Sequence, residues 1–244
     1  MARTLRTIYH IMVKDLRVYY FKPPNLIMGL MFPVVMVLAM AMRNPGQPEW
    51  LAPGLVALTI LFGTSTIEVV LIMWERQMQT FERLLLAPIP LGGLVAAKVA
   101  GGAVFGLFIT AAVAVFSFTI LGASVANPPL LLAAILASTW CFSTFGTLFG
   151  TIGKDMVGAS MTTSNYIRFP MIFLSGIFVP LAAMPLVFQV LAYFVPLTYS
   201  VSLLRAAYLG QVSDLPPAVS LAALFVFGLV FLLWSIRNLA RERA

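Results

Sequence analysis

The sequence predicts an all-α integral membrane protein: six transmembrane helices, an N-terminal interfacial helix, and a proline-rich outer re-entrant hairpin between the fifth and sixth spans. Hydrophobic residues make up 61% of its 244 residues and charged residues only 9%, whereas soluble domains average about 45–50% and 25%. No residue from Val99 to Gly153 is charged. This composition excludes a cytosolic enzyme, a secreted disulfide module and a disordered tail.

Residues 2–21 form an amphipathic helical pattern. Apolar residues recur every three or four positions, and basic residues occupy the opposite side. Such a helix is expected to lie in the membrane interface, where its cations meet anionic lipid headgroups. A solvated helix on a soluble partner is the alternative. Lys22-Pro23-Pro24 then ends the helix and turns the chain into the bilayer.

Six apolar segments can each cross a hydrocarbon core, which needs about 20 helical residues. The expected spans cover residues 25–42, 51–73, 94–121, 130–152, 159–179 and 216–236 of a single transmembrane domain, 1–244. The uncharged run is too long for one span, so it holds two, with a turn between Gly122 and Pro129. Residues 180–215 are apolar but repeatedly interrupted by proline, which favours short helices that dip into the outer leaflet.

The distribution of basic residues predicts the orientation. Six spans place both termini on one side, together with the 74–98 loop and the 153–158 turn. These segments hold twelve Lys and Arg residues, whereas the opposite loops hold two, Arg43 and Arg205. Lys and Arg are retained on the cytoplasmic side, so both termini are expected in the cytoplasm and the chain in the cell (inner) membrane. This placement accounts for the net charge of +7 without nucleic-acid binding.

The sequence shows no means of catalysis. One histidine, His10, and one cysteine, Cys141, cannot make a zinc site with ordinary ligand sets, so no metal site is expected. Gly153-Lys154 is the one Gly-Lys pair, and Leu148 stands where the first glycine of a phosphate-binding loop should be. The chain itself is therefore not expected to be an enzyme or to hydrolyse ATP.

Residues 74–92, between the second and third spans, are expected to form a short charged helix that stops before Pro88. Glu75 and Glu82 are seven residues apart and are expected on one helix face, with Arg76 and Arg83 beside them. A charged helix with an aromatic residue at its centre is suited to a groove in a soluble partner. A solvated connector explains the same pattern.

Two charges fall inside expected spans. Glu68 lies about 9 Å from the nearer interface, and Arg168 lies at a similar depth in the fifth span. Intramembrane charges are costly and usually mark function or a partner. We expect a Glu68–Arg168 pair within or between protomers, with Thr64 extending the polar stripe. A substrate-headgroup site and side chains that reach back to the interface are the alternatives.

Two stretches resemble ABC-2 type exporter permeases. The first match is to the family's coupling segment, the name we use from here on for residues 74–92. It consists of Glu75-Arg76, Thr80-Phe81-Glu82-Arg83-Leu84-Leu85, Ala87-Pro88-Ile89-Pro90 and then Lys98. The second match, to the fifth span and outer hairpin, consists of Phe173-Leu174-Ser175-Gly176-Ile177-Phe178-Val179-Pro180, Met184-Pro185, Pro196-Leu197-Thr198-Tyr199 and Arg205. The family often has glycine before the threonine of the coupling segment, where this chain has Gln79.

The resemblance implies a type II ABC exporter-like fold and a homodimer of this chain with two copies of a separate ABC ATPase subunit. That partner would bind ATP and Mg, and this chain would hold no cofactor. The residues expected to contact the ATPase are Glu75, Arg76, Thr80, Phe81, Glu82 and Arg83. The residues that mark the outer hairpin are Ser175, Gly176, Pro180, Pro185 and Pro196.

The expected function is therefore ATP-driven export of an amphipathic, lipid or lipid-linked substrate out of the cytoplasm or inner leaflet. An ATP-independent secondary transporter or channel is the main alternative and predicts ion-binding carboxylates at the midplane. Glu68 is the one acidic residue inside an expected span. A purely structural membrane scaffold is a third possibility, which predicts no ATPase partner.

Overall fold

The computed structural model describes residues 2–23, 48–87, 89–119, 122–153, 157–210 and 215–243, and between these 25, 27, 29, 31, 34, 35, 38 and 42. The helices are α1 (Ala2–Asp15), α3 (Pro48–Gln77), α4 (Thr80–Leu86), α5 (Leu91–Thr119), α6 (Pro128–Ile152), α7 (Val157–Leu174), α8 (Leu186–Tyr193), α9 (Pro196–Leu209) and α10 (Pro217–Arg243). A π-helical turn, η1 (Leu16–Tyr20), follows α1, and a 3₁₀ turn, η2 (Leu181–Ala183), precedes α8. No strand occurs within the described residues, so the all-α prediction is confirmed.

Four described helices are long and apolar enough to cross a membrane: α3 over Leu51–Gln77, α5, α6 and α10. A fifth crossing results if α8 and α9, which are bent by 92° at their junction, form one span. The expected span at 25–42 lies mostly outside the described residues. α7 occupies the expected fifth span but has only 18 residues and ends at Leu174, before the expected end at 179. The count of six spans thus stays a prediction.

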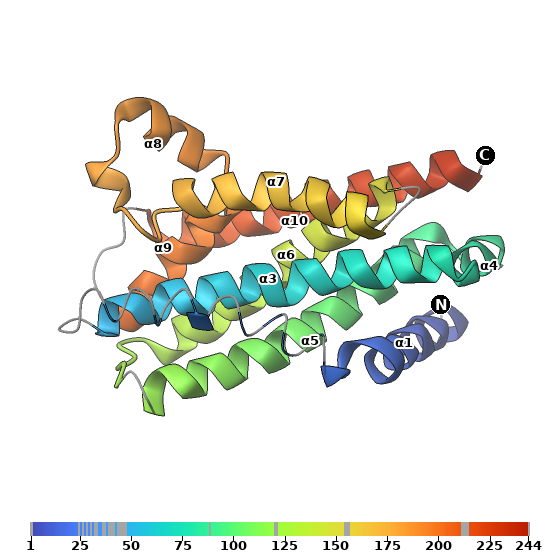
Figure 1. Ribbon diagram of the computed structural model, residues 1–244, viewed down its shortest axis with the longest axis horizontal. Coiled ribbons are helices and arrows are strands. Elements are labelled where there is room, and N and C mark those ends of the chain that lie inside the picture. Colours follow the sequence, from blue (N-terminus) through green and yellow to red (C-terminus); the bar gives the residue numbers. More distant parts are fainter. Residues whose placement is uncertain are drawn as a thin grey trace.

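The long helices lie lengthwise beside one another, and the two ends of the molecule differ (Figure 1). α1, α4 and the C-terminal end of α10 lie at one end, which we call the terminal end. α8 and the start of α9 lie towards the other, the hairpin end. The segment expected to bind a soluble partner therefore lies at the same end as both chain termini.

α3 is the central helix. Of its most apolar stretch 94% is buried, against 22% for α10. A glycine on each of the neighbouring helices α5 and α6 makes room for α3. A Cβ at Gly106 of α5 would clash with Thr64, and one at Gly146 of α6 would lie 2.7 Å from the Ser65 backbone. Small residues let helix backbones approach closely. Gly106 and Gly146 therefore both serve to pack α3.

Residues of the expected outer hairpin form η2, α8 and α9. Pro196 is the first residue of α9, a position where its missing N–H costs no helix bond. α8 is largely exposed, whereas α9 is buried almost throughout. Ser200 of α9 shares a 2.7 Å hydrogen bond with Ser138 of α6, and Tyr208 shares one of 3.1 Å with Ser117 of α5. The second half of the hairpin thus belongs to the core, and its re-entrant depth stays a prediction.

Candidate functional site

The coupling segment is a sharp turn between two helices. α3 ends at Gln77, and α4 begins at Thr80. Gln79 between them has φ 55° and ψ 18°, the one left-handed non-glycine residue in the described chain. The Thr80 hydroxyl donates to the Glu75 carbonyl over 3.1 Å and so ties α4 back to α3. Glycine would adopt the left-handed conformation of residue 79 without strain, whereas a side chain such as that of Gln79 disfavours it.

Because of this turn, the prediction that Glu75 and Glu82 share one helix face is wrong. The seven-residue spacing places two side chains together only on a continuous helix, and the left-handed residue at Gln79 interrupts it. Glu75 is fully buried, whereas Glu82 is exposed.

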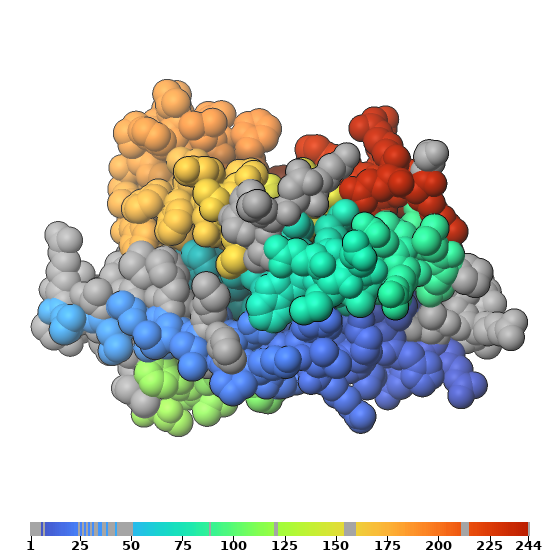
Figure 2. Space-filling view, turned by 45° about the vertical axis from the view of Figure 1, so that its right-hand side comes forward, coloured from blue at the N-terminus to red at the C-terminus, as the bar shows by residue number. Residues whose placement is uncertain are grey.

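Glu75 lies in a buried group of charges from three helices, Lys14, Asp15, Glu75 and Lys98, which we call the charge cluster. The Lys98 ammonium contacts Glu75 at 2.5 Å and Asp15 at 2.7 Å. Lys14, at the rim, contacts the same two carboxylates at 2.7 and 2.9 Å. The cluster thus joins α1, α3 and α5. Figure 2 shows the N-terminal residues, in blue, as a layer directly against the blue-green region that contains α4.

The electrostatics of the cluster are balanced. Burial raises the pKa of the Asp15 carboxyl, and the Lys98 ammonium opposes this shift. Burial acts to lower the pKa of Lys14, but its hydrogen bond to Glu75 and the nearby carboxylates outweigh burial and raise it. Two cations face two carboxylates. Removing one member would leave a buried charge without compensation, which typically destabilises a protein by about 3–5 kcal/mol.

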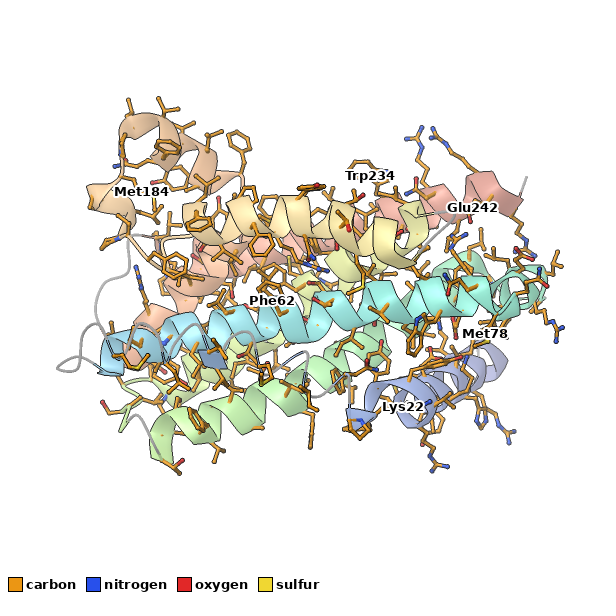
Figure 3. All side chains as sticks on the ribbon, viewed as in Figure 1. Lys22, Phe62, Met78, Met184, Trp234 and Glu242 are labelled. Carbon is orange, nitrogen blue, oxygen red and sulfur yellow. The ribbon has the colours of Figure 1, made fainter. Side chains whose placement is uncertain are left out.

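Arg76 joins the coupling segment to the last helix. Its guanidinium forms a 2.9 Å ion pair with Glu242 of α10, which Figure 3 labels at the terminal end. It also lies 4.7 Å from the centre of the Phe81 ring. Phe81 is only 1% exposed and packs in an apolar cluster with Ile11 and Leu239. Arg76 and Phe81 therefore hold α4 between the first and last helices.

Glu82 and Arg83 are exposed and Thr80 is partly exposed, so these predicted contacts are open to a partner. Glu75 and Phe81 have no surface to offer in this conformation. Two apolar side chains that the sequence did not single out are instead prominent: Met78 is 73% exposed and Leu86 81%. The sequence signal that could have found Leu86 is its four-residue spacing from Glu82, which places the two side chains on one face of α4. We call Met78, Gln79, Glu82, Arg83 and Leu86 the docking patch.

Glu68 is fully buried and accepts a 2.5 Å hydrogen bond from the Tyr20 hydroxyl. Burial and the Glu68 carboxylate raise the pKa of the Tyr20 phenol well above its usual range, so it stays a donor. Tyr20 was not predicted as a site residue, because nothing local in the sequence joins it to a residue 48 positions away. Thr64, one turn before Glu68, packs at Gly106, and its hydroxyl donates to the Ile60 carbonyl.

The structure does not bring Glu68 and Arg168 together within one chain. Glu68 faces α5 and α6, because a Cβ at Gly102 or Gly146 would meet it. Arg168 lies on α7, where its Nη1 donates to Asn165 over 3.0 Å. Both side chains are fully buried within the chain. A pair between protomers would require this packing to open, and it stays a prediction.

Of the residues predicted to mark the outer hairpin, Ser175, Gly176 and Pro180 lie in the turn after α7. The Ser175 hydroxyl donates to the Ile172 carbonyl over 2.8 Å, and Gly176 has φ 85°. Arg205 of α9 donates to the Gly176 carbonyl over 2.6 Å and so holds this turn on the core. Pro180 and Pro185 flank η2 and α8, where a cavity of about 270 Å³ is lined by Phe173, Leu174, Val179, Ala183, Met184, Pro185 and Phe188. Figure 3 labels Met184 there.

Comparison with known proteins finds relatives that match most of this chain. The Inner membrane transport permease YadH of Escherichia coli (strain K12) is 26% identical over 190 residues, which cover 77% of this chain and 73% of that protein. Nodulation protein J of Sinorhizobium fredii (strain NBRC 101917 / NGR234) is 26% identical over 208 residues, 84% of this chain and 78% of that protein. The family described as ABC-2 type transporter matches residues 6–209. The chain therefore belongs to the ABC-2 type transporter family.

Proposed function

We propose that this chain is the membrane-spanning subunit of an ATP-driven exporter, in which a homodimer of the chain works with two copies of a separate ABC ATPase subunit. One observation carries the proposal: the docking patch is exposed, while the buried residues directly beside it anchor it to four helices. ATP and Mg would bind to the partner. A soluble protein that pushes on α4 would thereby move the transmembrane helices.

The contacts support two routes for this movement. Glu75, two residues before the turn, connects through Lys98 to α5 and through Lys14 to α1. Arg76 connects through Glu242 to α10. The Lys98–Glu75 pair is buried, and Arg76–Glu242 is mostly so. Hydrogen bonds between charged groups are short and directional, so these pairs can transmit a displacement between the helices. The charge cluster is thus proposed to position the docking patch rather than to contact the ATPase.

The proposed location is the inner membrane, with both termini and α4 in the cytoplasm. The bias of Lys and Arg towards the segments beside the termini supports this orientation. The common position of α1, α4 and the end of α10 at the terminal end agrees with it (Figure 1). The Escherichia coli relative is named as an inner membrane transport permease.

The proposed substrate is an amphipathic, lipid or lipid-linked molecule that leaves the cytoplasm or the inner leaflet. The cavity of about 270 Å³ at the hairpin end has an apolar lining and suits a short apolar group. Membrane lipid also surrounds the exposed apolar side chains of α10, such as Phe225 and Leu233. Residues Glu68 and Arg168 remain candidates for a charge pair or for the substrate path.

The double variant Glu82→Ala/Arg83→Ala tests the proposal. Both side chains are exposed, so the variant should insert and fold normally. After a mild-detergent pull-down, we expect it to lose most of the partner's transport-linked ATPase activity. Arg17→Ala, which removes an exposed charge from η1, serves as the control. Undiminished ATPase stimulation in the double variant would contradict the proposal that the ATPase contacts the docking patch. A stable assembly that purifies without any ATPase would favour the ATP-independent transporter or channel.

A further inference from the structure

α7 carries a short run of polar residues before a buried arginine. Residues 162–165 are Thr-Thr-Ser-Asn, and Arg168 follows them. Thr162 and Thr163 are exposed, Asn165 is partly exposed, and Arg168 is fully buried. Polar side chains at membrane depth face a water-filled path or another protein surface rather than lipid. Asn165, three residues before Arg168 and on the same side of α7, is thus the partly exposed polar residue beside the guanidinium.

The Arg168 guanidinium lacks the partner that a buried cation needs. Nη1 donates to Asn165, but Nε and Nη2 have no hydrogen-bond partner in the described part of the chain. No carboxylate of those residues lies within ion-pair distance of it. An arginine stays charged in proteins, and an isolated buried charge is strongly unfavourable. The Lys98 ammonium, by contrast, contacts two carboxylates.

We propose that Arg168 binds the anionic group, a carboxylate or a phosphate, of an amphiphile, and that Asn165 orients the guanidinium. The planar guanidinium matches carboxylate and phosphate with paired N–H donors, and Nε and Nη2 are such a pair. This proposal rests on the proposed export function and assigns the substrate a negative charge.

Two further features of α7 fit an amphiphile. Phe173 and Leu174 line the apolar cavity and lie five and six residues beyond Arg168, about 8 Å along the helix. Pro170 lies inside α7 and has no N–H for the carbonyl one turn earlier. Helices bend at such positions, so a bend in α7 is expected beside Arg168. The apolar cavity lies within the length of an alkyl chain from Arg168, on another side of α7.

The test measures binding to the purified full chain in nonionic detergent. The probes are dodecyl phosphate and dodecanol, which share an alkyl chain and differ in charge. A ligand that binds the folded state raises the unfolding midpoint with concentration, which gives its affinity. The variant is Arg168→Gln, and the matched control is Arg237→Gln, which removes an exposed arginine of α10.

We expect the unaltered chain and Arg237→Gln to prefer dodecyl phosphate. Arg168→Gln should bind it about tenfold more weakly or worse, the factor for one hydrogen bond between charged groups, and bind dodecanol as before. If Arg168→Gln does not fold, Arg168→Lys keeps the charge without the planar donors and should bind dodecyl phosphate with intermediate affinity. Equal affinity for dodecyl phosphate in all variants would overturn the proposal.

A Glu68–Arg168 pair makes the opposite prediction. If Glu68→Arg and Arg168→Glu each abolish folding or transport but their combination restores it, the two residues pair, and the ligand proposal is wrong. No rescue by the combination is expected if Arg168 serves a ligand.

The source of the anion is settled with the ATPase complex in phosphatidylcholine vesicles. Stimulation of ATP hydrolysis by dodecyl phosphate identifies a transported amphiphile. Displacement of dodecyl phosphate by added phosphatidylglycerol, without stimulation, identifies a resident lipid headgroup at the same site. If no ATPase copurifies, the proposed function fails, whereas the binding measurement still decides the role of Arg168.

Discussion

The two ends of the molecule join their helices with different chemistry. At the terminal end, α1, α3, α5 and α10 are tied through the charge cluster and the Arg76–Glu242 pair. At the hairpin end, α9 is tied to α5 and α6 by hydroxyl pairs such as Ser138–Ser200. The loop before α6 adds backbone bonds, of which the Asn127 amide to the Ala207 carbonyl, at 2.9 Å, is one.

The two kinds of contact differ in how much stability is lost when one partner is removed. Hydroxyl and backbone bonds contribute about 1 kcal/mol each and carry no net charge. Removing one member of a buried charge pair costs more stability than this, because the remaining member is left as a buried ion without a partner. We therefore expect a single substitution to have its largest effect at the terminal end, which is also the end proposed to contact the ATPase.

The largest expected effect is at Lys98. Lys98→Met removes the ammonium that contacts Asp15 and Glu75, and should destabilise the chain by about 3–5 kcal/mol. Tryptophan fluorescence during thermal unfolding in detergent measures it, with the exposed Lys22→Met as control. A midpoint equal to that of the control would show that the terminal end does not depend on the cluster. Adding Glu75→Gln should lower stability by less than the sum of the single effects.

At the hairpin end, the strongest single contact is that of Arg205. Arg205→Leu removes the donor to the Gly176 carbonyl and should lower stability by about 1.5–3 kcal/mol, the usual contribution of a hydrogen bond to a charged group. The same unfolding measurement applies. The effect should stay below that of Lys98→Met. A larger loss would reverse the comparison between the two ends.

The smallest expected effect has the opposite sign. Gln79→Gly places glycine at φ 55° and should stabilise the turn by about 1 kcal/mol, because a side chain is disfavoured in this conformation. Gln77→Gly, the same substitution at the end of α3, should instead destabilise by about 0.5–1 kcal/mol. If both variants shift the unfolding midpoint in the same direction, the stability change in Gln79→Gly does not come from relief of backbone strain at residue 79.

Composition and apolar runs determined much of the fold. The spans expected at 51–73, 94–121, 130–152 and 216–236 fall on α3, α5, α6 and α10. Helix starts were also readable in part, because proline is favoured in the first helical turn, as at Pro128 and Pro196. α7 was harder to assign, since its polar residues weaken the apolar signal.

Hydropathy and helical period are local properties, so the sequence was enough to predict an all-helical membrane protein and to propose residues 74–92 as the segment that a partner contacts. The pairings between helices follow from the tertiary structure alone. Lys14 and Glu75 are 61 residues apart, and Tyr20 and Glu68 are 48 apart. The left-handed turn at Gln79 rotates α4 away from the face of Glu75. Which charges are buried, and with which partners, depends on how helices distant in the chain pack together, and no local pattern records that packing.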